Sequence, residues 1–187
     1  MTGMPLAASD RELVERAAHG DEGAFRAIVE RHERAVARTV TAMLGTGDDA
    51  DDAGQEAFIR LFRALPNFRG ESEVATYLTR IAVNVCCDVL ERRRKRSGWI
   101  RLFGGDADPP IEVDDTGDAV ETDERKRAVR RAIAALDAKH RAVVVLRILE
   151  ERPTREVAEL LGVPEGTVMS RLKRALEKLA AMLEKHS

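Results

Sequence analysis

Apolar residues recur every three or four positions through most of the first hundred residues, which is the period of an amphipathic helix. Ser9 and Glu12 form an S-x-x-E capping box at the start of the first apolar run. A second row extends from Phe25 to Leu44, and a third helix is expected to end at Pro66, because proline lacks the N–H group that a helix interior needs. The pattern predicts four helices, at about residues 9–20, 25–44, 51–65 and 74–96.

The periodicity disappears in residues 98–123, where glycine, proline and acidic residues accumulate, and it returns from residue 124. We therefore predict an all-α fold in which two small helical domains, residues 1–97 and 124–187, are joined by an acidic flexible linker. The core of the second domain is expected to include Val129, Ile133, Leu136, Val143, Val144, Leu146, Ile148 and Leu149.

The end of the chain has the pattern of two helices joined by a tight turn. Pro153 and Thr154 form a helix start, Gly162 forms a helix end, and a further helix begins near Glu165. This is the helix-turn-helix arrangement, whose second helix enters the major groove of DNA. At 100° per residue that helix separates an apolar side (Val168, Leu172, Ala175, Leu176, Leu179) from a side of hydroxyls and cations (Thr167, Ser170, Arg171, Arg174, Lys178).

Hydroxyl and cationic side chains at this spacing supply the donors that phosphates and guanine edges accept, so this face is predicted to contact DNA. The alternative is an amphipathic surface helix whose basic face is only solvated.

The charge is divided unevenly along the chain, although the net charge of the 187 residues is only −2. Residues 1–97 carry about as many bases as acids, residues 98–124 carry one base and nine acids, and residues 125–187 carry 15 bases and eight acids. The basic end suits a polyanion and the acidic middle suits a basic partner.

Composition argues against membrane, metal and redox chemistry. No run of about 18 apolar residues occurs and the first residues lack the features of a signal peptide, so a cytoplasmic protein is expected. Cys86 and Cys87 are adjacent, which gives no metal-ligand spacing and a strained geometry for a mutual disulfide. The histidines are scattered. No metal and no other cofactor are expected.

Acidic residues crowd the start of the third predicted helix, between Asp48 and Glu56. A calcium loop is excluded because, counted from Asp49, the fifth and twelfth positions are Ala53 and Arg60. Acids at a helix start interact favourably with the helix dipole, and they also offer a docking face for a basic helix of a partner. A helical metal hydrolase using these acids would need a further histidine or carboxylate at ligand spacing, which the sequence does not offer.

The loop before the fourth predicted helix, with Phe68 and Arg69, and the polar face of that helix, with Arg80 and Asn84, form another candidate site. An exposed aromatic ring beside polar groups can stack on an unpaired base. The alternative is that Phe68 closes the domain core. The basic run from Arg92 to Arg96 could grip phosphates or be a solvated helix end.

Four stretches, residues 49–65, 68–96, 136–151 and 155–179, resemble in order and spacing regions two and four of the extracytoplasmic-function (ECF) sigma factors of bacterial RNA polymerase. The resemblance implies a non-enzymatic promoter-specificity subunit. It assigns polymerase binding to Asp51, Asp52, Gln55 and Glu56. It assigns recognition of the minus-ten DNA element to Phe68, Arg69, Tyr77, Arg80, Asn84, Arg92, Arg93 and Arg94. It assigns recognition of the minus-thirty-five DNA element to Thr167, Ser170, Arg171, Lys173, Arg174 and Lys178.

The resemblance also implies three partners, namely core RNA polymerase, promoter DNA and an anti-sigma factor, and it implies a linker that threads into basic channels of the polymerase. Two departures from the family pattern stand out: Tyr77 replaces the usual tryptophan, and Gly54 lies where a larger aliphatic residue is usual. The remaining alternative is a LuxR-like helix-turn-helix regulator that binds DNA as a dimer without being a polymerase subunit.

Overall fold

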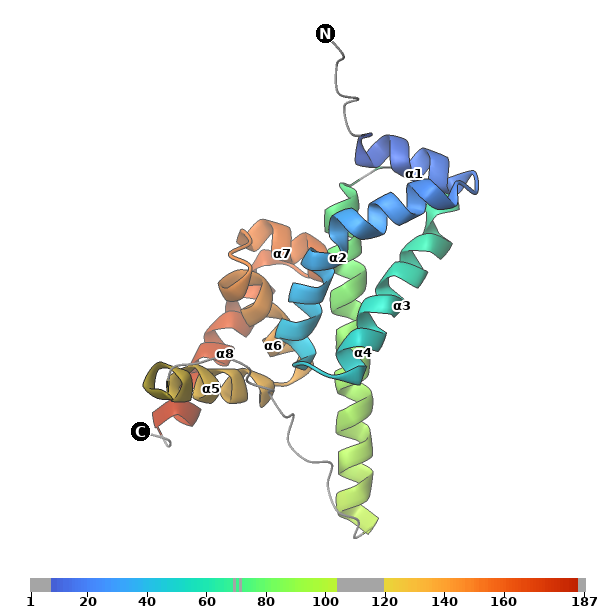
Figure 1. The fold of residues 1–187 in the computed structure, drawn as a ribbon. Helices are drawn as coiled ribbons and strands as arrows, with labels where there is room; N and C mark the ends of the chain where they lie inside the picture. The colour runs from blue at the N-terminus through green and yellow to red at the C-terminus, as the bar shows by residue number, and fades with distance from the viewer. Residues whose placement is uncertain (1–7, 69, 71, 104–119, 185–187) are drawn as a thin grey trace.

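The computed structural model describes residues 8–68, 70, 72–103 and 120–184, and over these residues the chain is helical and contains no strand. The first domain holds α1 to α4 and the second holds α5 to α8 (Figure 1). The elements are α1 (Asp10–Ala18), α2 (Glu22–Leu44), α3 (Asp48–Ala64), the 3-10 turn η1 (Leu65–Asn67), α4 (Val74–Phe103), α5 (Val120–Ala134), α6 (Ala138–Val144), the π-helical turn η2 (Val145–Leu149), α7 (Thr154–Leu161) and α8 (Glu165–Glu184). The predicted all-α fold is confirmed.

The first domain forms because each helix has a local start signal and an apolar stripe. The capping box at Ser9 is present, with both reciprocal hydrogen bonds to Glu12, and Asp21 caps α2 by accepting from the Ala24 N–H at 3.0 Å. Asp10 ties α1 to α2 through an ion pair with Arg31 and a contact of 2.9 Å to the His32 ring. Helices α2, α3 and α4 then pack together around one apolar core.

The second domain places the helix-turn-helix on top of α5 and α6. Asp137 caps α6, and Gly162 ends α7 in the left-handed conformation (φ 62°) that favours glycine. Val168 and Ala175 are fully buried and Leu172 and Leu179 half-buried, so the apolar side of α8 faces the domain as the sequence predicts, except for Leu176, which is exposed.

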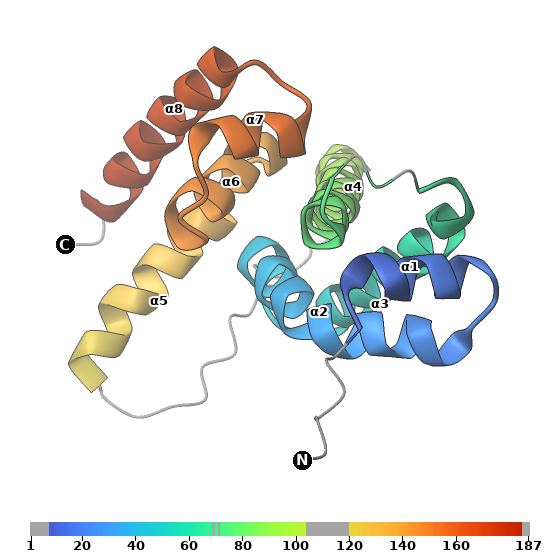
Figure 2. The ribbon, with the colours of Figure 1, turned by 90° about the horizontal axis from the view of Figure 1, so that it is seen from above.

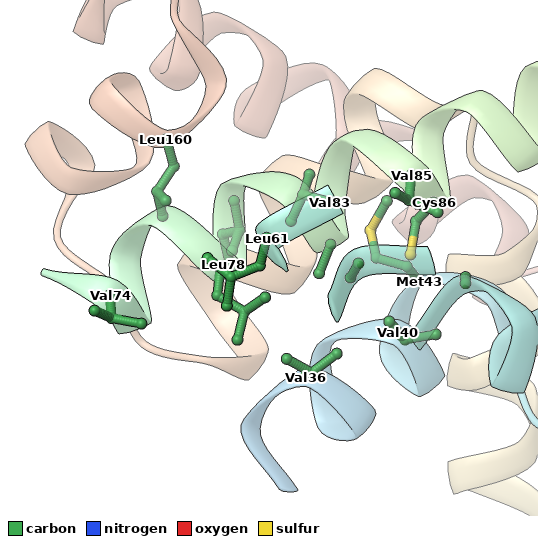
Figure 3. Close-up of a cluster of buried hydrophobic side chains, with 14 of the residues drawn as sticks. Val36, Val40, Met43, Leu61, Val74, Leu78, Val83, Val85, Cys86 and Leu160 are labelled. Carbon is green, nitrogen blue, oxygen red and sulfur yellow. The ribbon is translucent and has the colours of Figure 1, made fainter. Parts of the chain in front are cut away.

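The two domains share one core, because α4 lies between them. Seen nearly end-on, α4 has α2 and α3 on one side and α6 and α7 on the other (Figure 2). The cluster of buried residues accordingly joins Val40, Met43 and Leu61 of the first domain to Leu160 of α7, with Leu78 and Val83 of α4 between them (Figure 3).

The structure differs from the sequence-based expectations in two respects. Helix α4 does not end near Arg96 but continues to Phe103, and α5 begins at Val120, so helix occupies both ends of the segment predicted as a linker. The rest of that segment, 104–119, lies outside the described residues. Three residues expected in the core of the second domain are exposed, so their assignment to the core is wrong: Val129, Ile148 and Leu149. Apolar character alone does not say which side of a helix meets its neighbours.

Candidate nucleic-acid interfaces

The polar face of α8 is built as the sequence predicts. Its hydroxyl and cationic residues lie outside the side that holds the buried Val168 and Ala175, with Arg171 at the edge, and the Ser170 hydroxyl donates to the Thr167 carbonyl at 3.1 Å. Ser170, Lys173 and Arg174 are exposed, while Thr167 and Arg171 are half-buried at the edge of the turn. A row of donors near the start of the second helix of a helix-turn-helix is the chemistry that phosphates and base edges accept.

The ammonium of Lys178, at the far end of this face, already forms an ion pair within the domain. It lies 3.1 Å from the carboxylate of Asp137, which also caps α6 and contacts His140. Partial burial raises the pKa of Asp137, but the hydrogen bonds from His140 and Lys178 outweigh it and hold this pKa well below its ordinary value. A phosphate contact by Lys178 therefore has to compete with an ion pair that also fixes α8 to the start of α6.

On α4 the structure assembles a surface stack that the sequence does not reveal. Phe68 and Tyr77 meet edge to face with ring centroids 5.1 Å apart, and the Arg80 guanidinium lies 5.0 Å above the Tyr77 ring. Phe68 is half-buried against the core cluster, so it contributes to closing the domain core, and its stacking on a base stays a prediction. Asn84 is exposed one turn beyond Arg80, and Arg69 lies outside the described residues. The stack offers an aromatic and cationic surface for an unpaired base.

The arginines Arg92, Arg93 and Arg94 do not act as one group, because successive residues of a helix point 100° apart. Arg93 pairs with Asp49 at the start of α3, its Nε lying 2.7 Å from the carboxylate, and the Arg92 Nε donates to the Asp88 carbonyl at 3.3 Å. Arg93 and Arg94 line a cleft of about 910 Å³ between α4, the start of α3, and α5 and α6. Only Arg92 and Arg94 of the three are exposed.

The acidic face of α3 is exposed along Asp51, Asp52 and Gln55, while Glu56 is half-buried. The carboxylate of Glu56 accepts a hydrogen bond of 2.8 Å from Arg60, which lowers the pKa of this carboxyl. Side chains of one helix that lie three or four positions apart share a face, so these groups form one continuous surface.

The same face of α3 continues into two apolar side chains that sequence reasoning did not select. Ile59 is 43% exposed and Phe62 is 50% exposed, and the Phe62 ring touches Phe25 of α2 edge to face at 4.9 Å. Phe62 counts among the apolar positions of the helix on sequence grounds, whereas Ile59, at 100° per residue, lies opposite the buried Ala57 and Leu61, and this position on the acidic side is the signal that could have selected it. Together with the acids they suit a partner surface that is basic and partly apolar.

Among the described residues, no three His, Cys, Asp or Glu side chains converge on a position for a metal ion. Burial raises the pKa of the Cys86 thiol to about 12 and that of Cys87 to about 11, so both remain protonated and unreactive at neutral pH. Within the same described part of the chain, no helix is long and apolar enough to span a membrane.

Comparisons with known proteins match both domains. Residues 28–96 match the sigma-70 region 2 family and residues 126–179 match the sigma-70 region 4 family. The ECF RNA polymerase sigma factor SigM of Mycobacterium tuberculosis is 35% identical over 94% of this chain and 85% of its own length. The ECF RNA polymerase sigma-E factor of Escherichia coli is 34% identical over 91% of this chain and 92% of its own length.

Two solved structures are similar to the whole arrangement. CnrH in complex with the cytosolic domain of CnrY superimposes with a TM-score of 0.66 at 29% identity, covering 95% of this chain and 99% of CnrH. The sigma factor RpoE of Bartonella quintana, in complex with the anti-sigma factor NepR, superimposes with a TM-score of 0.64 at 19% identity, covering 86% of this chain and 96% of that one. The second likeness supports the fold alone.

Proposed function

This chain belongs to the ECF sigma factors of bacterial RNA polymerase, and we propose that it joins core polymerase through α3 and positions it on a promoter through α4 and α8. Its function is to direct promoter-specific transcription initiation. We further propose that it does so in the cytoplasm and without catalytic groups of its own. The LuxR-like dimeric regulator is not supported, because the comparisons match the first half of the chain as well as the helix-turn-helix.

The observation that carries the proposal is that one chain presents two polar surfaces of different chemistry. The face of α8 has the donors of a duplex reader, and the stack on α4 has the rings and cations that suit an unpaired strand. A factor that opens a promoter needs both, since it must hold intact duplex at one element while it stabilises separated strands at another.

On α8, we assign recognition of the minus-thirty-five element to Thr167, Ser170, Arg171, Lys173 and Arg174. We expect Lys178 to contribute less, because it is paired with Asp137. Arg171 and Arg174 are the candidates for bidentate contacts to guanine, each worth about 1–3 kcal/mol of discrimination. The hydroxyls and Lys173 supply contacts to phosphates, which set the register of the helix in the groove.

On α4, we assign the minus-ten element to the stack of Phe68, Tyr77 and Arg80, with Asn84 beside it. Removing a base from the duplex costs a few kcal/mol of stacking and pairing energy. Stacking of that base on Tyr77, together with hydrogen bonds from Asn84, would offset this cost. Arg69, outside the described residues, is assigned to the same site from the family resemblance. We assign contacts with the upstream DNA phosphates to Arg92 and Arg94. Arg93 can make such a contact only if its ion pair with Asp49 breaks.

Core polymerase is assigned to the acidic face of α3, with Asp51, Asp52, Gln55 and Glu56 as the polar contacts. A basic helix of the polymerase would find complementary charge there. Ile59 and Phe62 are exposed and add apolar area at the end of the same face. Burial of this area would stabilise the contact at high salt, while the acidic side chains would steer association at low salt.

The remaining assignments concern the acidic segment and regulation. The predicted role of the linker in the polymerase channels falls on residues outside the description, and its test is neutralisation of Asp106, Asp108, Asp114, Asp115 and Asp118. That change is expected to alter the ratio of abortive to full-length transcripts. The solved relative CnrH is bound to the cytosolic domain of a second protein, CnrY, which supports the proposal that an anti-sigma factor holds this chain as well.

The experiment that tests the function is run-off transcription with purified core polymerase and a library of genomic promoter fragments. The proposal predicts a small set of discrete start sites that core polymerase alone does not give, with shared sequences about ten and thirty-five base pairs upstream. Transcription that is the same with and without the chain would refute it.

A further inference from the structure

The start of α8 carries a large apolar side chain that is exposed beside the polar face. Met169 is 53% exposed, although Val168 before it is fully buried and Leu172 after it is half-buried. At 100° per residue, Met169 lies at the border between the apolar side and the polar face, about 40° from Lys173 and about 100° from Ser170. Its thioether therefore lies next to donors that we assign to the minus-thirty-five element.

The turn of the helix-turn-helix holds this side chain near the start of α7. Gly162 ends α7 in the left-handed conformation, and the Pro164 carbonyl accepts a hydrogen bond of 2.9 Å from the N–H of Thr167 at the start of α8. The Thr154 hydroxyl, at the N-terminal end of α7, lies 3.8 Å from the Met169 sulfur. A thioether sulfur is a weak hydrogen-bond acceptor, so this contact orients the side chain and still leaves about half of its residue exposed.

The place of Met169 along α8 corresponds to the part of a recognition helix that reaches base edges. In a helix-turn-helix, residues near the start of the second helix contact the bases, whereas the first helix crosses the DNA backbone. Met169 lies in the second turn of α8, which begins at Glu165. Leu176 is also exposed and lies on nearly the same line of the helix, but about two turns, or about 10 Å, further from the start. The two residues therefore share a chemistry and differ in their expected distance from the bases.

The chemistry of the major groove offers an apolar side chain one particular partner. The edges of the base pairs present hydrogen-bond donors and acceptors there, and thymine adds its C5-methyl group. The Met169 side chain has no donor, so burying a polar base edge under it would leave that edge without a hydrogen bond. A flexible, polarisable thioether can instead adapt to the shape of a methyl group. Contact with a thymine methyl is therefore the arrangement that stabilises Met169 in the groove.

The residues beside Met169 allow a base pair to approach it closely. Gly166, less than one turn earlier, has no side chain, and a Cβ atom placed there would have no neighbour within 4 Å. Packing inside the domain therefore does not require glycine at this position, whereas close approach of DNA to the start of α8 would benefit from it. Ser170 and Lys173 are exposed on the same side and can bind phosphates or polar base edges next to the methyl group.

We propose that Met169 is a specificity-determining residue that contacts the C5-methyl group of one thymine, on either strand of the minus-thirty-five element. The inference rests on the proposed function, because it requires α8 to lie in the major groove of a promoter. The contact adds apolar discrimination to the hydrogen bonds of the polar face. A methionine that met only water or the DNA backbone would not distinguish one base from another.

The test removes the contact from each side in turn, first from the DNA and then from the protein. In a promoter found by run-off transcription, each thymine of the minus-thirty-five element is replaced singly by deoxyuridine, which lacks only the C5-methyl group. The affinity of the holoenzyme, formed from core polymerase and the full chain, is measured by competition against the unmodified promoter. Met169→Ala removes the apolar side chain, Met169→Leu keeps one, and Leu176→Ala is the matched control at the exposed position further along α8.

For the wild type, deoxyuridine at one thymine is expected to weaken promoter binding about fourfold, the usual worth of one buried methyl group. Met169→Ala should weaken binding to the unmodified promoter by a similar factor and abolish the effect of that deoxyuridine, whereas Met169→Leu and Leu176→Ala should retain it. An element in which no thymine methyl affects the wild type, or an undiminished deoxyuridine effect with Met169→Ala, overturns the inference and leaves the proposed function standing. A wild type that forms no promoter complex with core polymerase refutes the proposed function, and the inference with it.

Discussion

The rings of Phe68 and Tyr77 meet edge to face at 5.1 Å, and Tyr77 in turn carries the Arg80 guanidinium on its face. The loop residue Phe68 therefore holds a helix residue, Tyr77, in one orientation. Fixing an aromatic side chain before a base arrives reduces the entropy that binding must offset. The contact makes Tyr77 the centre of the site assigned to the minus-ten element.

Removal of the Tyr77 ring should weaken strand separation without affecting duplex recognition. We expect Tyr77→Ala to reduce the open complex by an amount equivalent to about 1–3 kcal/mol, the usual worth of one stacked base, and Tyr77→Trp to retain or improve it. A fluorescent base analogue in the minus-ten element reports the open complex. Binding to a fragment that carries only the minus-thirty-five element serves as the control; an equal loss there would point to a folding defect.

Arg174 and Lys178 should behave differently although both lie on the polar face of α8. Arg174→Ala is expected to cost about 1–3 kcal/mol at one upstream base pair and to relax specificity there. Lys178→Ala should leave specificity unchanged, because Lys178 is paired with Asp137. Holoenzyme binding to single-base variants of the promoter separates the two effects. Equal, sequence-independent losses for both variants would show that Arg174 contacts only phosphate.

The apolar end of the α3 face should contribute to polymerase binding. Phe62 is about half exposed, and Phe62→Ser removes this exposed aromatic area from the expected contact. We therefore expect the affinity for core polymerase to fall by about 1 kcal/mol, or roughly fivefold. Leu176→Ser, a similarly exposed apolar residue on α8, is the matched control. Competition for core polymerase against a labelled sigma factor measures the affinity; unchanged competition by Phe62→Ser would exclude Phe62 from the interface.

The carboxylate of Asp137 should make the second domain sensitive to acid. Its pKa is lowered in the folded state, so it stabilises the fold above its unfolded pKa of about 4, and this contribution is lost as the pH falls further. Asp137→Asn keeps a capping side chain but removes the charge. Urea unfolding should show the variant to be less stable than the wild type at pH 7, with the difference shrinking below about pH 4. Asp88→Asn, at a more exposed carboxylate, is the control.

The sequence predicted the helices because their start signals and apolar stripes are local. Ser9 with Glu12, Gly162, and the sorted faces of α8 all behave as expected. The length of α4 was underestimated, because a basic run resembles a helix end even when the helix continues to Phe103. Local patterns carry no information on which neighbour covers a given side of a helix.

The contacts between domains could not be predicted for that reason. Arg141 resembles a surface arginine in the sequence, yet it is buried on the end of α2, about 100 positions earlier in the chain. Ile148 and Leu149 resemble core residues and are exposed, whereas Glu150, next to them, is buried by Thr39 and Arg152. The burial of Arg141 and Glu150 depends on contacts with α2 of the first domain, which no local pattern encodes.

The central claim is that this chain is a polymerase subunit that recognises promoters, and the most direct measurement is its co-sedimentation with purified bacterial core RNA polymerase at moderate ionic strength. The account predicts a stoichiometric complex that survives about 0.15 M salt and is weakened by substitutions on the acidic face of α3, such as Asp52→Arg. A chain that sediments alone under these conditions, with its helix content intact, would contradict it.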